Sequence, residues 1–262
     1  MNRGTLLSKS YRKASKEFGL RLEKIRDNPS IDNVHDLRTS IRRWEAVVDL
    51  FPKNVRKSKK MKKYLSGAGK LFRSTTPVRD LDVVSQNISH YSGRQNFSVI
   101  STINHDRALL VSNTLHFSES LAKIDPPKIR KRNLSSKAIA KRQDRLVKRL
   151  VAKLREELPV VLGDYRKIKE LHDMRKECKK LRYILELFPS DRYEDLALLM
   201  KDWQTILGSI RHIDVTQQFA EEKGLTENLE DVLTKLRISR DKLLGSFTST
   251  AKLEKDTIPA GI

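Results

Sequence analysis

Two segments of the chain place a histidine ahead of arginine and lysine residues at helical spacing. The first reads VHDLRTSIRRWEAVVDLF over residues 34–51, and the second reads LHDMRKECKKLRYILELF over residues 171–188. At about 100° per residue, His35, Arg38 and Arg42 share one side of a helix. Arginine gives paired hydrogen bonds to phosphoryl oxygens, lysine gives an adaptable point charge, and imidazole adds a donor. These residue types at this spacing are suited to binding a phosphate-rich anion.

The second segment repeats the arrangement of the first. His172, Arg175 and Lys179 take the corresponding side of the helix, and Lys176 lies beside them. The opposite side is apolar in both segments and carries Leu37, Ile41, Trp44, Val48 and Phe51 in the first and Met174, Cys178, Leu181, Leu185 and Phe188 in the second. A merely solvated face carries charges of both signs and needs no histidine at a fixed place, so a duplicated stripe of one sign favours a binding role. At the stripe edge, binding and solvated interpretations stay equally open for Arg43, Lys180 and Arg182.

These segments belong to a longer internal repeat. His35 and His172 are 172 − 35 = 137 residues apart, and a proline follows the last phenylalanine of each segment. Downstream, RDLDV at residues 79–83 is matched by RHIDV at residues 211–215, at an offset of 211 − 79 = 132 residues. Two ordered matches with nearly the same offset indicate a duplicated helical unit, and two copies often pack about a pseudo-two-fold axis.

Composition limits the classes of protein that the sequence can encode. The 262 residues include 54 Lys+Arg and 33 Asp+Glu, which gives a net charge of +21 and implies a polyanionic partner such as nucleic acid, an anionic membrane surface or a polyphosphate. Hydrophobic residues make up 38%, which is enough for a core, but no apolar run approaches the roughly 20 residues of a membrane span. The first residues lack the apolar region of a secretory signal. The single cysteine, Cys178, excludes an intramolecular disulfide and a cysteine-rich zinc site. We therefore expect the protein to reside in the reducing environment of the cytoplasm.

Helical periodicity extends over nearly the whole chain. Proline, glycine and capping residues predict helices over about 5–27, 33–51, 55–74, 80–92, 98–122, 135–158, 167–188, 192–207, 212–222 and 227–246. No segment predicts a strand. The sequence therefore predicts an all-α fold of two helical bundles, residues 1–126 and 127–249, followed by a flexible tail over 250–262.

The histidine-headed segments resemble the CHAD family, a helical domain named for its histidines. The family pattern is His-x-x-Arg-x-x-x-(Arg/Lys)-(Arg/Lys), present twice, with a Leu-Gly-x-x-Arg-Asp-x-Asp-Val-like segment after each copy, and the resemblance covers about residues 5–246. In the second copy, Leu207-Gly208 matches the Leu-Gly of the downstream segment. In the first copy, Thr75-Thr76 stands where the Leu-Gly is expected. Glu45 occupies a column where a third base is common, and the second copy has Arg182 there.

The resemblance implies two bundles related by a pseudo-two-fold axis, with a basic central groove or pore that binds inorganic polyphosphate. It implies a binding or targeting module rather than an enzyme, with no metal or cofactor, in the cytoplasm and in association with polyphosphate granules. Other polyanions are further candidate partners. The predicted polyphosphate-binding residues are His35, Arg38, Arg42, Arg43, Arg79, His172, Arg175, Lys176, Lys179, Lys180, Arg182 and Arg211.

Several alternatives stay open. Arg79 and Arg211 can instead pair with the aspartate three residues on and hold a helix start, since carboxylates are poor ligands for a polyanion. The protein can also be a nucleic-acid-binding protein, a phosphoanhydride-processing enzyme or a metal chelator that uses the two motif histidines. The other four histidines lack the spacing of a metal-binding pair. The segment LSGAGK at residues 65–70 does not match the pattern of a phosphate-binding loop. The basic runs at 57–63 and 128–155 are interpreted as solvated faces that widen a polyanion footprint.

Overall fold

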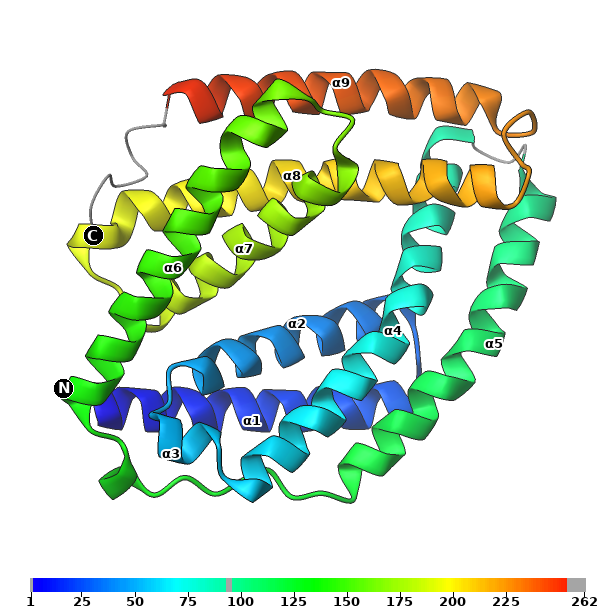
Figure 1. The fold of residues 1–262 in the computed structure, drawn as a ribbon. Coiled ribbons are helices and arrows are strands. Elements are labelled where there is room, and N and C mark those ends of the chain that lie inside the picture. Colours follow the sequence, from blue (N-terminus) through cyan, green and yellow to red (C-terminus); the bar gives the residue numbers. More distant parts are fainter. Residues whose placement is uncertain (1, 93–95, 254–262) are drawn as a thin grey trace. The chain divides into compact units, whose positions relative to one another are not determined.

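The computed structural model describes residues 2–92 and 96–253 (Figure 1). The helices are α1 (Arg3–Asp27), α2 (Ile31–Asp49), α3 (Lys53–Arg56), α4 (Lys59–Ser92), α5 (Phe97–Ala122), α6 (Ser136–Gly163), α7 (Ile168–Leu187), α8 (Glu194–Glu222) and α9 (Glu230–Leu253). Short 3-10 helices cover Lys131–Asn133 and Asp191–Tyr193. No strand occurs in these two described ranges, so the all-α prediction is confirmed.

The chain divides into two compact units, and each unit takes two segments of the sequence. Unit 1 comprises Met1–Asp82 and Ser101–Gln143, and unit 2 comprises Val83–Ile100 and Asp144–Ile262. Helices α4, α5 and α6 therefore each begin in one unit and end in the other. The predicted boundary of the sequence repeat near residue 126 and the pseudo-two-fold axis stay predictions.

An aromatic cluster forms the centre of unit 1. Trp44 on α2 is fully buried, and its ring lies 6.0 Å from that of Phe18 on α1 and 5.2 Å from that of Tyr64 on α4. The indole Nε1 donates to Ser15 Oγ at 3.1 Å, so the polar atom of this buried ring is satisfied. Burial raises the pKa of Tyr64 to about 12. Helices α1 and α2 pack along each other around this cluster (Figure 1).

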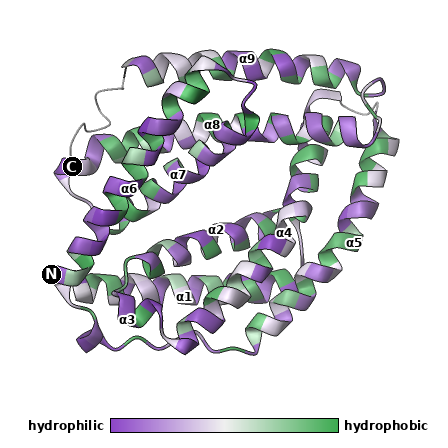
Figure 2. Cartoon of the chain, viewed as in Figure 1, coloured by the Kyte–Doolittle hydropathy of each residue, from purple (hydrophilic) through white to green (hydrophobic). Residues whose placement is uncertain are grey.

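In unit 2, α8 packs against both α7 and α9. Trp203 on α8 is fully buried and meets Phe247 on α9 edge-on, with 5.4 Å between ring centroids. Leu181 and Cys178 on α7 are also fully buried. Figure 2 shows the corresponding pattern, in which hydrophilic and hydrophobic residues alternate along each helix at the spacing of its turns. The prediction that Trp44, Leu181 and Trp203 belong to the core is confirmed.

The predicted break between residues 74 and 80 is wrong, because α4 continues through Pro77. Proline lacks the N–H that would bond the carbonyl four residues earlier. In the turn before Pro77, Thr75 Oγ1 and Thr76 Oγ1 donate to the carbonyl of Phe72 at 2.8 and 3.1 Å. Arg38 Nη1 on α2 donates to the same carbonyl at 3.0 Å.

Three other predicted helix ends are also wrong. Helix α6 passes Pro159 and ends at Gly163, and α8 passes Gly208 as one continuous helix. Packing of the buried sides of these helices outweighs the local cost of a single proline or glycine. Helix α8 ends at Glu222, as predicted, just before Gly224, whose φ of +64° suits a residue without Cβ. The predicted tail begins later than residue 250, since α9 reaches Leu253, and the rest of that tail lies outside the described residues.

Among the described residues, no helix is both long and apolar enough to cross a membrane.

Cys178 gives a direct chemical test of this packing. Its side chain is fully buried, and burial raises the pKa of the thiol, which suppresses the reactive thiolate. We expect the folded protein to react with a thiol-specific reagent at pH 8 at least about a hundredfold more slowly than the same protein in denaturant. Because the chain has one cysteine, the signal comes from this site alone. Equal rates in the two conditions would contradict the described packing of α7.

Candidate functional site

Helices α2 and α7 carry the histidine-headed segments, one in each unit. The apolar side of each is buried as the sequence predicts, with Leu37, Ile41, Trp44, Met174, Cys178 and Leu181 fully excluded from solvent. The other side carries the predicted basic residues. We name these the α2 face (His35, Arg38, Arg42 and Arg43) and the α7 face (His172, Arg175, Lys176, Lys179, Lys180 and Arg182).

Local capping residues fix the start of α2. The Ser30 side chain accepts a hydrogen bond from the backbone N–H of Asn33 at 3.2 Å, and Asp32 lies in the first turn, where a negative charge favours the helix dipole. His35 therefore lies about one turn inside the helix and is exposed, as are Arg42 and Arg43. No side-chain cap precedes α7, which begins after Lys167.

Arg38 on the α2 face is anchored to α4. Its Nη1 donates to the carbonyl of Phe72, to Thr75 Oγ1 at 2.8 Å and to Thr76 Oγ1 at 3.0 Å. The threonines that depart from the family's Leu-Gly pattern are thus the acceptors for this arginine. These three neutral acceptors orient the half-buried guanidinium of Arg38.

The ring of Phe72 supports two guanidinium groups. The central carbons of Arg38 and Arg42 lie 4.1 and 3.9 Å from the ring centroid, within the range of cation–π attraction. Arg42 also pairs with Glu45 three residues on, with Nη1 and Oε2 3.0 Å apart. Glu45, which stands where the family commonly has a base, therefore uses one of the hydrogen-bond donors of the Arg42 guanidinium.

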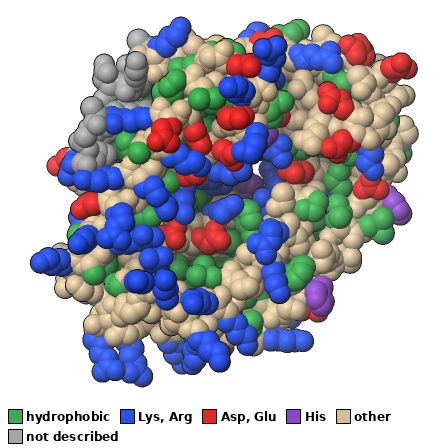
Figure 3. Space-filling model, in the orientation of Figure 1, with side chains coloured by type: hydrophobic (Ala, Val, Ile, Leu, Met, Phe, Trp, Pro, Cys, Tyr) green, Lys and Arg blue, Asp and Glu red, His purple; other side chains and the backbone are tan. Residues whose placement is uncertain are grey.

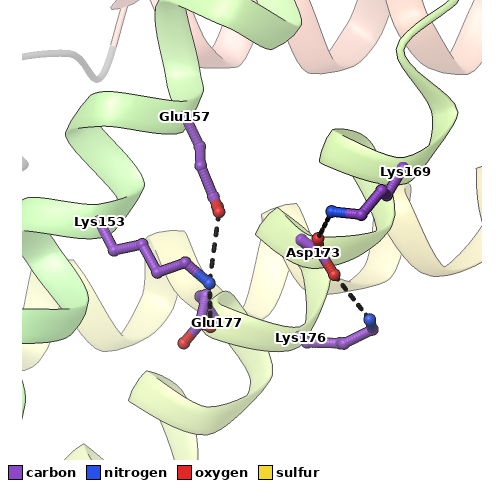
Figure 4. A network of polar contacts seen from close by, with 6 residues as sticks. All are labelled: Lys153, Glu157, Lys169, Asp173, Lys176 and Glu177. Atoms are coloured by element: carbon purple, nitrogen blue, oxygen red, sulfur yellow. Dashed lines mark hydrogen bonds and ion pairs between the residues drawn. The ribbon is translucent and has the colours of Figure 1, made fainter.

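On the α7 face, acidic side chains neutralise part of the positive charge. Asp173 contacts Lys176 at 2.7 Å and Lys169 at 2.8 Å, so one carboxylate lies between two ammonium groups (Figure 4). Hydrogen bonds from Lys169 and Lys176 lower the pKa of Asp173 to about 2, so it is ionised at neutral pH. A polyanion that approaches Lys176 competes with this carboxylate.

A second ion pair joins α6 to α7. Lys153 Nζ lies 2.5 Å from Glu177 Oε1 and 3.4 Å from Glu157 Oε1 (Figure 4). Burial is the largest effect on Glu157 and raises its pKa. Further along α7, Arg182 pairs with Glu186 at 2.8 Å, and its guanidinium lies 5.3 Å from the Tyr183 ring.

Beneath the α7 face, a buried carboxylate connects three elements of unit 2. Asp214 on α8 has 2% of its side chain exposed, and its Oδ1 lies 2.7 Å from Arg240 Nε on α9. Arg240 Nη2 also donates to the carbonyl of Tyr165, just before α7 begins, at 3.2 Å. The other oxygen, Oδ2, lies 2.9 Å from His172 Nε2. Burial by itself raises the pKa of Asp214, but the hydrogen bonds from His172 and Arg240 outweigh it and lower that pKa.

Unit 1 contains the same combination of carboxylate, arginine and carbonyl. Asp82 on α4 is fully buried, and its Oδ1 lies 2.5 Å from Arg107 Nε on α5. Arg107 Nη2 donates to the carbonyl of Pro29, just before α2 begins, at 2.8 Å. Asp82 Oδ2 accepts no hydrogen bond from any described residue.

Sequence reasoning assigned the aspartates a structural role but missed their partners. Asp82 pairs with Arg107, and Asp214 pairs with Arg240. Arg79 is half-buried, and burial lowers its pKa although nearby aspartates oppose the effect. Arg211 is likewise half-buried. The missed arginines lie 240 − 107 = 133 residues apart, close to the offset of the aspartates, and a search for further recurrences at that spacing would have found them.

The remaining candidates do not form a second site. His90, His105, His116 and His212 are exposed, and residues 65–70 lie inside α4. No group of three or more histidine, cysteine, aspartate or glutamate side chains in the described ranges could hold a metal ion. Figure 3 shows many Lys and Arg side chains on the viewed face with fewer acids among them, as the net charge of +21 requires.

Comparisons with known proteins agree with this fold. A family model described as CHAD domain matches residues 11–221. A crystal structure of the CHAD domain from the plant Ricinus communis is similar, with a TM-score of 0.64 and 12% sequence identity over 95% of this chain and 91% of that chain. That likeness concerns the fold alone. No curated protein matches this chain.

The buried pair in unit 2 predicts a pH-dependent stability. Removing one partner of a buried ion pair costs roughly 3–5 kcal/mol, so Asp214→Asn should lower the free energy of unfolding by that order at pH 7. Because the folded-state pKa of Asp214 is lowered, its contribution is present above the unfolded pKa and is lost as pH falls through the folded value. The difference in free energy of unfolding between wild type and Asp214→Asn should therefore become smaller below about pH 4.

Denaturant titrations between pH 3 and pH 7 measure this difference, with Asp241→Asn as the control. Asp241 is exposed on α9 beside Arg240, and its replacement should change stability by less than about 0.5 kcal/mol at every pH. If Asp214→Asn lowers the free energy of unfolding as much at pH 3 as at pH 7, the role assigned to the charge of Asp214 is wrong.

Proposed function

The chain belongs to the CHAD family, and from this premise we propose that it binds inorganic polyphosphate through the α2 face and the α7 face. The proposed role is a binding or targeting module rather than an enzyme. The observation that carries this proposal is the recurrence of a histidine-headed row of cations on two helices whose opposite sides are fully buried. We further propose that binding takes place in the cytoplasm, where polyphosphate granules supply the ligand.

The chemistry of the two faces suits a linear chain of phosphates. Such a chain carries about one negative charge per unit and offers no base or sugar, so its binder needs cations and hydrogen-bond donors rather than stacking surfaces. The faces supply guanidinium, ammonium and imidazole groups together. Their aromatic rings do not offer free stacking surfaces, since Phe72 lies against Arg38 and Arg42, and Tyr183 is buried.

Nucleic acid is the second candidate ligand because the net charge of +21 suits any polyanion. Sequence-specific recognition of single strands generally uses exposed aromatic side chains, and aromatic residues make up only 6% of this chain. In competition at physiological salt, long-chain polyphosphate should displace labelled single- or double-stranded DNA. Retention of the DNA would instead favour the nucleic-acid function. Release of orthophosphate in the presence of a divalent metal would favour an enzyme.

Charge reversal on both faces should weaken polyphosphate binding. Arg42 and Lys176 are exposed, so replacing both by glutamate should leave the helical content and the melting temperature nearly unchanged. We expect the dissociation constant for long-chain polyphosphate at 150 mM salt to rise more than about tenfold. The slope of log affinity against log salt concentration should also become shallower, because fewer condensed counterions are released.

The matched control is the double variant Lys24→Glu, Lys242→Glu. These lysines are exposed on α1 and α9, and their reversal changes the net charge by the same amount. In calorimetric titrations at 50 and 200 mM salt, the dissociation constant of the control for long-chain polyphosphate should rise at most threefold. We attribute a change of that size to the altered net charge alone. Equal losses in the two double variants, or wild-type binding that ignores salt, would contradict the assignment to the α2 and α7 faces.

A further inference from the structure

A buried carboxylate contacts the motif histidine of unit 2. In unit 2, the imidazole Nε2 of His172 lies 2.9 Å from Asp214 Oδ2, and the His172 side chain is only 15% exposed. In unit 1, His35 is exposed, and the corresponding oxygen, Asp82 Oδ2, accepts no hydrogen bond from the described residues although it is fully buried.

The buried aspartate lies close to the histidine turn in both units. Arg240 joins Asp214 to the carbonyl of Tyr165, three residues before α7 begins. Arg107 joins Asp82 to the carbonyl of Pro29, two residues before α2 begins. The carboxylate–arginine pair thus positions the motif helix in each unit. In unit 2, Asp214 also contacts the motif histidine.

We propose that Asp214 is a positioning residue for anion binding, because it holds the His172 imidazole by Nε2 and leaves Nδ1 as the nitrogen that meets a phosphoryl oxygen. This inference rests on the proposed function. A ring that donates its Nε2 proton to a carboxylate can carry the second proton on Nδ1 and donate it to an anion. His172 therefore enters binding already oriented and loses little side-chain freedom when it binds.

Whether Asp214→Asn strengthens or weakens polyphosphate binding separates this positioning role from a purely electrostatic effect of the carboxylate. Asp214 is an anion close to the α7 face, so if it acts only through its charge, Asp214→Asn should strengthen polyphosphate binding. If Asp214 orients His172, the same substitution should weaken binding. Asp82→Asn is the matched control, since it removes an equally buried carboxylate that pairs with an arginine in the same way and whose Oδ2 accepts no hydrogen bond from the described residues.

The test compares the dissociation constants of long-chain polyphosphate for the full-length variants at one salt concentration. His172→Ala should weaken binding about tenfold. Asp214→Asn should weaken it at least as much, and adding His172→Ala to Asp214→Asn should cause no further loss, since both remove the same oriented donor. Asp82→Asn reports the effect of loosening a motif helix alone, so its loss should be clearly smaller.

A spectroscopic measurement tests the orientation without any ligand. In the ¹⁵N-labelled protein, long-range imidazole ¹H–¹⁵N spectra, assigned with His→Gln variants, should show His172 with its proton on Nε2. Asp214→Asn should shift the His172 nitrogens and leave those of His90 and His105 in place. If Asp214→Asn unfolds the protein, Asp214→Glu and His172→Ala decide the question.

Outcomes that overturn the inference are a tighter complex with Asp214→Asn, a loss with Asp82→Asn as large as that with Asp214→Asn, or His172 nitrogens that do not respond to position 214. Failure of the wild-type protein to bind polyphosphate would reject the proposed function instead. In that case the imidazole spectra still show whether Asp214 orients His172.

Discussion

A carboxylate buried in a helical protein must be paired, and this requirement sets the position of both motif helices. Asp82 and Asp214 are each met by an arginine from the helix that follows in sequence, and that arginine also binds a carbonyl just ahead of α2 or α7. The start of each motif helix is thereby fixed against two others. With the start fixed and the apolar side buried, the basic side is the one left to solvent.

Holding several cations on one helix side is the second constraint, and the two units meet it differently. The α2 face uses neutral groups, namely the threonine hydroxyls beneath Arg38 and the Phe72 ring beneath Arg38 and Arg42. On the α7 face, Asp173 and Glu186 pair with Lys176 and Arg182. Glu45 also pairs with Arg42 on the α2 face, so a ligand of either face must displace carboxylates or bind beside them. In unit 2, His172 bonded to Asp214 adds a donor that is already oriented.

The sequence predicted the features that depend on periodicity. The buried side of α2, with Trp44, and that of α7, with Cys178 and Leu181, followed from their spacing alone. Helix ends were harder, because Thr75, Thr76 and Arg38 support α4 through Pro77, and the Arg38 contact comes from another helix. The partners of Asp82 and Asp214 were also missed, since Arg107 and Arg240 lie in segments with no motif of their own.

The central claim is that the basic sides of α2 and α7 are where a phosphate chain binds. A crystal structure of the protein with tripolyphosphate tests it most directly. The account predicts phosphoryl oxygens within hydrogen-bond distance of Arg42 and Arg38 on α2, or of His172 Nδ1 and Lys176 on α7. Phosphates seated instead on the lysines of residues 57–63, with both basic sides unchanged from the ligand-free protein, would contradict it.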